Sequence, residues 1–81
     1  MIYRLHQDRA IRAVRATLPG PAALELTRAL DGVLADPKST TTPYGVDDGV
    51  MRLLTLSEVM AVLMVNEATA TITLLQITSL T

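Results

Sequence analysis

Seven consecutive apolar residues, Val59 to Val65, constrain the fold of this chain more than any other segment. The segment is far too short to cross a bilayer, which takes about 20 apolar residues in a helix. Both faces of a strand formed by these residues are apolar, so we expect the central strand of a sheet. A sheet alone could not bury this much aliphatic surface, and other elements must supply a second layer.

Three further segments have the pattern of strands. Val50 to Leu56 precedes the central run across a short connection, and Thr69 to Leu80 follows it across a connection of hairpin length. In the last segment apolar residues alternate with threonine until the apolar phase shifts at Leu74-Leu75, which predicts a bulge or cover on both faces. Ile2 to Leu5 alternates as a short first strand, which we place at or near an edge.

Two helices are predicted between the first strand and the others. Asp8 suits the N-cap of the first, and apolar residues follow it at helical spacing: Ala10, Ile11, Val14 and Leu18. Pro19-Gly20-Pro21 ends this helix, and Pro21 suits the first turn of the second. The second helix has a wide apolar stripe that consists of Ala23, Leu26, Ala29, Leu30, Val33 and Leu34. Asp36-Pro37 ends it, and a loop with at most a short extended segment follows at residues 38–49.

These elements predict one α+β domain over residues 1–81, in the order β-α-α-β-β-β, with the helical hairpin packed on a mainly antiparallel sheet. The core must be aliphatic because Tyr3 and Tyr44 are the only aromatic residues. The chain has no cysteine, which excludes disulfides and thiolate ligands. No apolar leader follows the N-terminus, so we expect a cytoplasmic protein without membrane contact.

The charge balance argues against a protein that grips nucleic acid through many phosphate contacts. Such a protein needs a basic face, whereas this chain has 7 basic and 8 acidic residues. Within this balance Arg9, Arg12 and Arg15 share one arc of the first helix. They form either a solvated face whose stems cover apolar surface, or an electropositive ridge for RNA or an acidic partner.

Few residues could carry chemistry. The sequence has no phosphate-binding loop, no dinucleotide-binding glycine turn, no Cys/His metal set and no Ser-His-Asp arrangement, so neither a cofactor nor a metal is expected. His6 is either a general base or an exposed turn residue, and Asp47-Asp48 either binds a divalent ion or forms a solvated turn. Arg52 lies in phase with Leu54 and Leu56 on a predicted strand, as an edge residue or as part of a site.

The element order and several short motifs resemble the RelE/ParE superfamily of bacterial toxins. Leu34-Ala35-Asp36-Pro37-Lys38 is similar to the end of that family's second helix, Tyr44-Gly45 to the following loop, and Met51-Arg52-Leu53-Leu54 to the next strand. The run Val59 to Val65 and the strand through Ile77 extend the resemblance over nearly the whole chain. It implies a toxin-like component of a type II toxin–antitoxin module, bound by a cognate antitoxin and acting on translation or on DNA gyrase.

Members of that family that cleave mRNA on the ribosome use several Lys or Arg side chains, because a pentavalent phosphate is dianionic and needs donors aimed at it. The resemblance makes Arg52 the catalytic candidate. Arg9, Arg12 and Arg15, from their shared helix face, are candidates for nucleic-acid or partner binding. Leu54 and Met60 stand where the family pattern has basic residues, which implies weak RNA cleavage or none. The ParE branch instead binds gyrase. The alternative is a non-catalytic binding or scaffold module, such as a homodimer through its edge strand.

Overall fold

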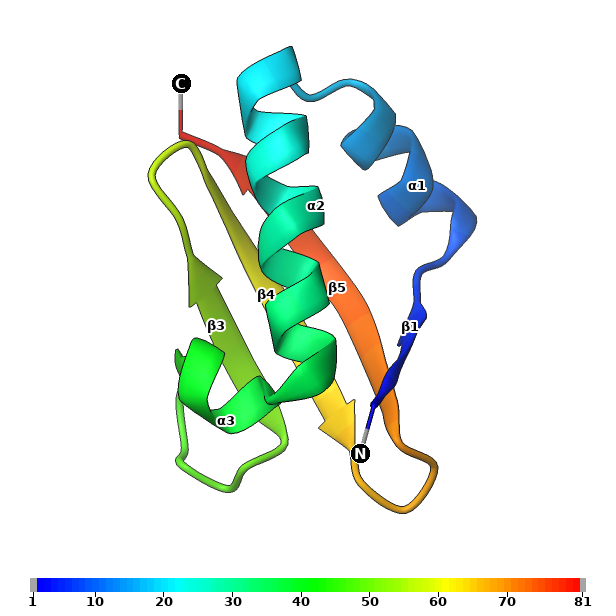
Figure 1. The fold of residues 1–81 in the computed structure, drawn as a ribbon, viewed down its shortest axis with the longest axis vertical. Helices are drawn as coiled ribbons and strands as arrows, with labels where there is room; N and C mark the ends of the chain where they lie inside the picture. Colours follow the sequence, from blue (N-terminus) through cyan, green and yellow to red (C-terminus); the bar gives the residue numbers. More distant parts are fainter. Residues whose placement is uncertain (1, 81) are drawn as a thin grey trace.

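The computed structural model describes residues 2–80, which form one long helix and two shorter ones on a five-stranded sheet (Figure 1). In chain order the elements are β1 (Arg4–His6), α1 (Arg9–Ala16), α2 (Gly20–Ala35), α3 (Pro37–Thr40), β2 (Thr42–Pro43), β3 (Met51–Thr55), β4 (Val59–Asn66) and β5 (Thr71–Ser79). The strand order is β1-β5-β4-β3-β2. β1 runs parallel to β5 and the other neighbours are antiparallel. The predicted α+β class and sheet type are confirmed.

The segment expected to be a loop, residues 38–49, holds two additional elements. α3 is a single turn that begins at Pro37 and is capped by Asp36, whose Oδ1 accepts a hydrogen bond from the Ser39 N–H at 3.4 Å. β2 is a two-residue strand that pairs with Leu53 and Arg52 of β3. Both elements are too short to produce a periodic pattern, so the sequence indicated only an extended Thr segment there.

The start of α1 agrees with the prediction, whereas its buried face is narrower than expected. Asp8 caps the helix, with its Oδ1 accepting from the Ile11 N–H at 2.8 Å. Of the four apolar residues expected to face the core, Ile11 is buried while Val14 is 40% exposed. The helix has only eight residues and lies near β5 beside α2, so only part of its apolar arc meets the sheet.

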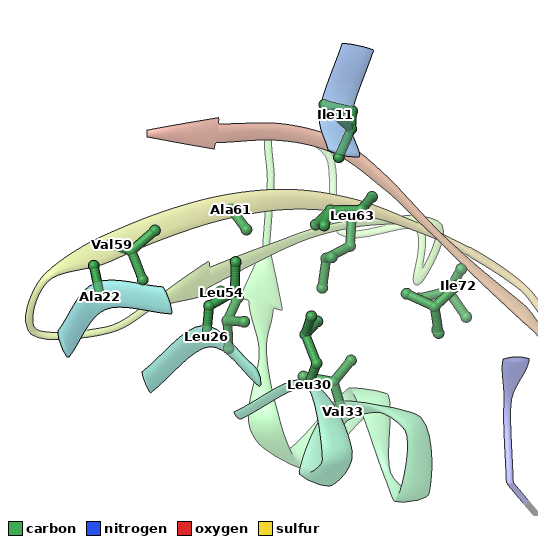
Figure 2. Close-up of a cluster of buried hydrophobic side chains, with 12 residues drawn as sticks. Ile11, Ala22, Leu26, Leu30, Val33, Leu54, Val59, Ala61, Leu63 and Ile72 are labelled. Carbon is green, nitrogen blue, oxygen red and sulfur yellow. The ribbon is translucent and has the colours of Figure 1, made fainter. Parts of the chain in front are cut away.

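β4 is the middle strand of the sheet, as its apolar sequence predicts. On the side of the helices it buries Val59, Ala61, Leu63 and Val65. Leu26, Leu30 and Val33 of α2 pack against this surface, and Figure 2 shows Leu26 and Leu30 directed at the strands. Burying a leucine of this kind contributes about 1.5–3 kcal/mol. One aliphatic layer between α2 and the sheet therefore holds the fold together.

The apolar phase shift in the last strand is a β-bulge. Val62 pairs with Gln76 and Leu63 pairs with Leu74, so Leu75 has no partner in β4. Leu74 is buried under the helices, whereas Leu75 is 42% exposed. The extra residue resets the alternation, and Ile77 packs against the core again.

Candidate functional site

The catalytic candidate Arg52 lies on β3, and its side chain is buried on the helix side of the sheet. Only 7% of the residue is exposed. Its Nε donates to the Thr41 hydroxyl at 2.9 Å, and its Nη2 donates to the carbonyl oxygens of Thr41 at 2.8 Å and of Lys38 at 3.3 Å. These bonds fasten α3 and the residue after it to the sheet.

The remaining nitrogen of Arg52 faces the outside of the molecule. Nη1 lies 3.7 Å from Asp47 Oδ1, and the Asp47 side chain is 76% exposed. A guanidinium offers five donors, and three of its hydrogen bonds here go to the chain itself. The arrangement fits an internal clamp, and the catalytic role of Arg52 stays a prediction.

The opposite surface of the sheet, which we call the open face, carries neutral side chains on β3, β4 and β5. Its positions on β3, β4 and β5 alternate with the buried ones and are Met51, Leu53, Thr55, Met60, Val62, Met64, Asn66, Thr71, Thr73, Gln76 and Thr78. A shallow hollow of about 90 Å³ lies there, with Tyr44, Met60, Gln76 and Thr78 in its lining. The open-face positions of β3, β4 and β5 include no cation, and Arg52 lies on the other side of the sheet. At the edge of the open face β1 adds Arg4 and His6, which pair with Thr71 and Thr73 and are exposed.

Two positions that the family pattern fills with basic residues lie in different environments. Leu54 is 3% exposed and belongs to the core under α2, so a side chain at this position does not reach solvent. Met60 is half-buried on the open face, beside Thr78 of β5. Of the two, only Met60 stands where a ligand on the open face could touch it.

The arginine stripe of α1 separates into two kinds of residue. Arg15 is half-buried and holds α1 against its neighbours, donating from Nη2 to the Thr27 hydroxyl at 2.9 Å and from Nη1 to Gln7 Oε1 at 3.3 Å. Arg9 and Arg12 are exposed, and residues 2–80 offer their guanidinium groups neither a hydrogen bond nor an ion pair. Arg9 and Arg12 are therefore the members of the stripe that are available to a partner.

The other polar candidates have local roles. Asp48 Oδ1 accepts from the backbone N–H groups of Val50 at 2.9 Å and of Met51 at 3.3 Å, so it organises the turn that begins β3. These bonds hold the pKa of Asp48 below its ordinary value, and the bond from Val50 contributes most. His6 is exposed on β1 opposite Thr73. Between residues 2 and 80 no three His, Asp or Glu side chains gather where they could hold a metal ion.

Sequence reasoning missed one polar contact altogether. The Glu25 carboxylate of α2 accepts from the hydroxyl and backbone N–H of Ser57, and from the backbone N–H of Glu58 at 2.9 Å. It thereby fixes the turn between β3 and β4 to the helix. The partners are 32 and 33 residues apart, and no local pattern connects positions at that separation.

This chain resembles known proteins in structure but not in sequence. The sequence matches no family model and no curated protein. In structure, a chain of the RelBE2 toxin–antitoxin complex from Mycobacterium tuberculosis is similar with a TM-score of 0.83 at 11% identity, over 98% of this chain and 99% of that chain. The isolated RelE toxin of E. coli gives 0.80 at 19% identity, over 95% and 83%. The RelE–RelB complex of Pyrococcus horikoshii gives 0.74 at 16% identity, over 98% and 96%.

The architecture is thus one that occurs in toxin–antitoxin proteins, along nearly the full length of this chain. The fold is that of the RelE toxins, which confirms the resemblance found in the sequence at the level of structure. No helix within residues 2–80 is both long and apolar enough to span a membrane.

Proposed function

We propose that this protein is a toxin-like component of a type II toxin–antitoxin module and that it binds its target rather than cleaving RNA. The observation that carries the proposal is the similarity to toxin–antitoxin structures over 93–98% of this chain. A match of that extent leaves little of the chain outside the shared fold. The cognate antitoxin is the expected partner, and the cytoplasm is the expected compartment.

The open face supports binding over cleavage. A phosphorane carries two negative charges, and a site that stabilises it must aim several donors at the same point. The hollow on the open face is instead lined by neutral residues such as Met60, Gln76 and Thr78. Arg4 lies apart from it at the β1 edge of the face, and Arg52 donates to Thr41 and Lys38 on the other side. DNA gyrase or a component of translation, bound without RNA cleavage, is the target that fits this surface. Arg9 and Arg12 are exposed cations on α1, and we assign them the contact with an acidic partner.

The test is induced expression of the chain in bacteria, with growth and mRNA integrity followed together. We expect growth arrest with intact mRNA, and arrest that Arg9→Gln/Arg12→Gln relieves. Arg28→Gln removes an exposed charge from α2, away from α1 and the open face, and serves as the control, which should leave the arrest in place. Cleaved transcripts that disappear in Arg52→Ala would restore Arg52 as a catalytic residue. Growth without arrest, with folded protein in the cells, would reject the toxin-like function.

A second candidate is the non-catalytic scaffold module that forms a homodimer. The observation in its favour is the apolar part of the open face, where Met51, Leu53, Met60 and Met64 are only half-buried. The edge strands are poor dimer contacts, since β1 has three residues and β2 has two, one of them Pro43. Light scattering that gives twice the chain mass, and the chain mass for Met60→Lys, would support this candidate. A monomer at all concentrations would exclude it.

A further inference from the structure

A cavity lies at the end of the sheet where β3 begins and β4 ends, away from the hollow on the open face. Its volume is about 410 Å³, within the range of about 300–1,000 Å³ that small ligands occupy in proteins. Lys38 of α3, the turn at residues 48–50 and the end of β4 line it. None of the functions considered above uses this cavity.

Part of the cavity lining is aliphatic. Val50 and Val65 lie on the same side of the sheet and belong to this lining, and Met64 faces the other side of the sheet. The Val65 N–H donates to the Val50 carbonyl at 2.8 Å, which extends the pairing of β3 and β4 by one step and fixes the two valines relative to each other. A short alkyl chain would therefore meet a surface that is already ordered.

The charged lining favours a cationic ligand. Asp48 and Glu67 are acidic and Lys38 is basic, which leaves one negative charge in excess. Asp48 is held in place by the N–H groups of Val50 and Met51, and its neighbour Asp47 is already paired with Arg52. The carboxylate of Asp48 is thus a fixed anion at the edge of an apolar surface.

The existing partner of Glu67 is easily replaced. Lys38 Nζ lies 3.8 Å from Glu67 Oε1, and the two side chains are 71% and 63% exposed. Ion pairs this exposed contribute little to stability. A second cation that also buries its alkyl chain can displace Lys38 at small cost.

We propose that this cavity binds an alkylammonium or alkylguanidinium group, with the cation between Asp48 and Glu67 and the alkyl chain on Val50 and Val65. The group belongs either to a lysine or arginine side chain of a partner polypeptide or to a free amine. The proposal is independent of the toxin-like function, because it rests on residues that the α1 arginines and the hollow on the open face do not include.

The test uses the full chain and amide chemical shifts in NMR, titrated with cadaverine, agmatine and the peptide acetyl-Gly-Lys-Gly-amide. We expect saturable shifts confined to residues 48–50 and 64–67. A peptide that binds at least as tightly as cadaverine identifies a partner side chain as the source, and a peptide that binds more weakly identifies a free amine. 1-Pentanol and valerate, the neutral and anionic counterparts, should bind at least about tenfold more weakly, as expected when a hydrogen bond to a charged group is lost.

Three variants make the test decisive. Asp48→Asn keeps an acceptor for the Val50 N–H, and with Glu67→Gln it should weaken cadaverine binding about tenfold or more. Lys38→Met removes the competing cation and should tighten binding, whereas Arg12→Met makes the same change in net charge elsewhere and should not. Equal shifts with pentanol, unaltered binding in the double variant, or equal effects of Lys38→Met and Arg12→Met would each overturn the proposal.

Discussion

At the scale of single residues, Arg52 links the strand to the irregular segment beside it. Its buried guanidinium donates to two carbonyl groups and to the Thr41 hydroxyl, which in turn donates to the Pro37 carbonyl. A buried acceptor that loses its donor costs more than the bond itself contributes. The sequence placed Arg52 on a strand with two leucines, and this contact explains why a charge is tolerated there.

Arg52→Met tests this role because it keeps much of the side-chain length and removes all donors. We expect the free energy of unfolding to fall by about 2–3 kcal/mol, measured by urea denaturation. Arg52→Lys should recover only part of the loss, because an ammonium cannot reproduce the planar fork. Arg12→Met, at an exposed position, should change the free energy by less than about 0.5 kcal/mol. Equal midpoints for Arg52→Met and Arg12→Met would show that the clamp does not stabilise the fold.

Glu25 makes a contact of the same kind from the helix layer. The hydroxyl of Ser57, followed by the backbone N–H of Glu58, lowers the pKa of Glu25 from its ordinary 4.5. A carboxyl with a lowered pKa in the folded state stabilises the protein above the pKa of the unfolded chain. That stability is lost as the pH falls below 4.5 and the group becomes protonated.

The prediction is that Glu25→Gln flattens the decline of thermal stability between about pH 6 and about pH 3. Asp36 and Asp48 also have lowered pKa values, set mainly by Ser39 and by the Val50 N–H, so the variant should retain part of the decline. Asp31→Asn, which removes an exposed carboxylate from the same helix, is the control. Parallel melting curves for Glu25→Gln and the unmodified protein across this range would contradict the assignment.

At the scale of elements, the turn between β4 and β5 contains a residue with a strained backbone conformation. Ala70 has φ = 50°, the only positive φ at a non-glycine residue among those described. Its carbonyl accepts from the Arg4 N–H at 2.8 Å, and its N–H donates to the Glu67 carbonyl at 3.3 Å. The left-handed conformation costs an ordinary residue about 1–2 kcal/mol, and these bonds hold Ala70 in it.

Ala70→Gly should therefore raise the free energy of unfolding by about 1 kcal/mol, because glycine adopts this conformation without a clash. Ala68→Gly in the same turn has no positive φ to relieve and should be neutral or slightly destabilising. Chemical denaturation of the two variants side by side measures the difference. Equal stabilities would mean that the strain at Ala70 is negligible.

The same turn illustrates what a sequence can and cannot predict about elements. The last strand was expected from Thr69 and begins at Thr71, because Thr69 and Ala70 complete the turn. Helix starts were predictable where a cap has a side-chain signal, as at Asp8. The bulge at Leu75 was predictable because it shifts a period of two. α3 and β2 could not be predicted, because a single helical turn and a two-residue strand are too short for a periodic pattern to be recognised.

At the scale of the whole molecule, the class and the layers follow from the run Val59 to Val65 and the helical stripes. Which side chains come together at the candidate site does not follow from these patterns. Arg9, Arg12 and Arg15 are equivalent in helical spacing, yet only Arg15 meets Thr27 and Gln7. Arg52 was recognised as unusual, but the side of the sheet it faces depends on α3. Residues that meet across layers leave no periodic signal in the sequence.

The pairing of β1 with β5 joins the first strand of the chain to the last, residue 4 with residue 71. Among the described elements β5 is synthesised last, so β4, which is apolar on both faces, is made before its longest neighbour. Pairings between residues so distant in sequence form slowly, and unpaired apolar strands aggregate. The sheet can therefore be completed only once β5 has been made, and β4 is the strand most prone to aggregation until then.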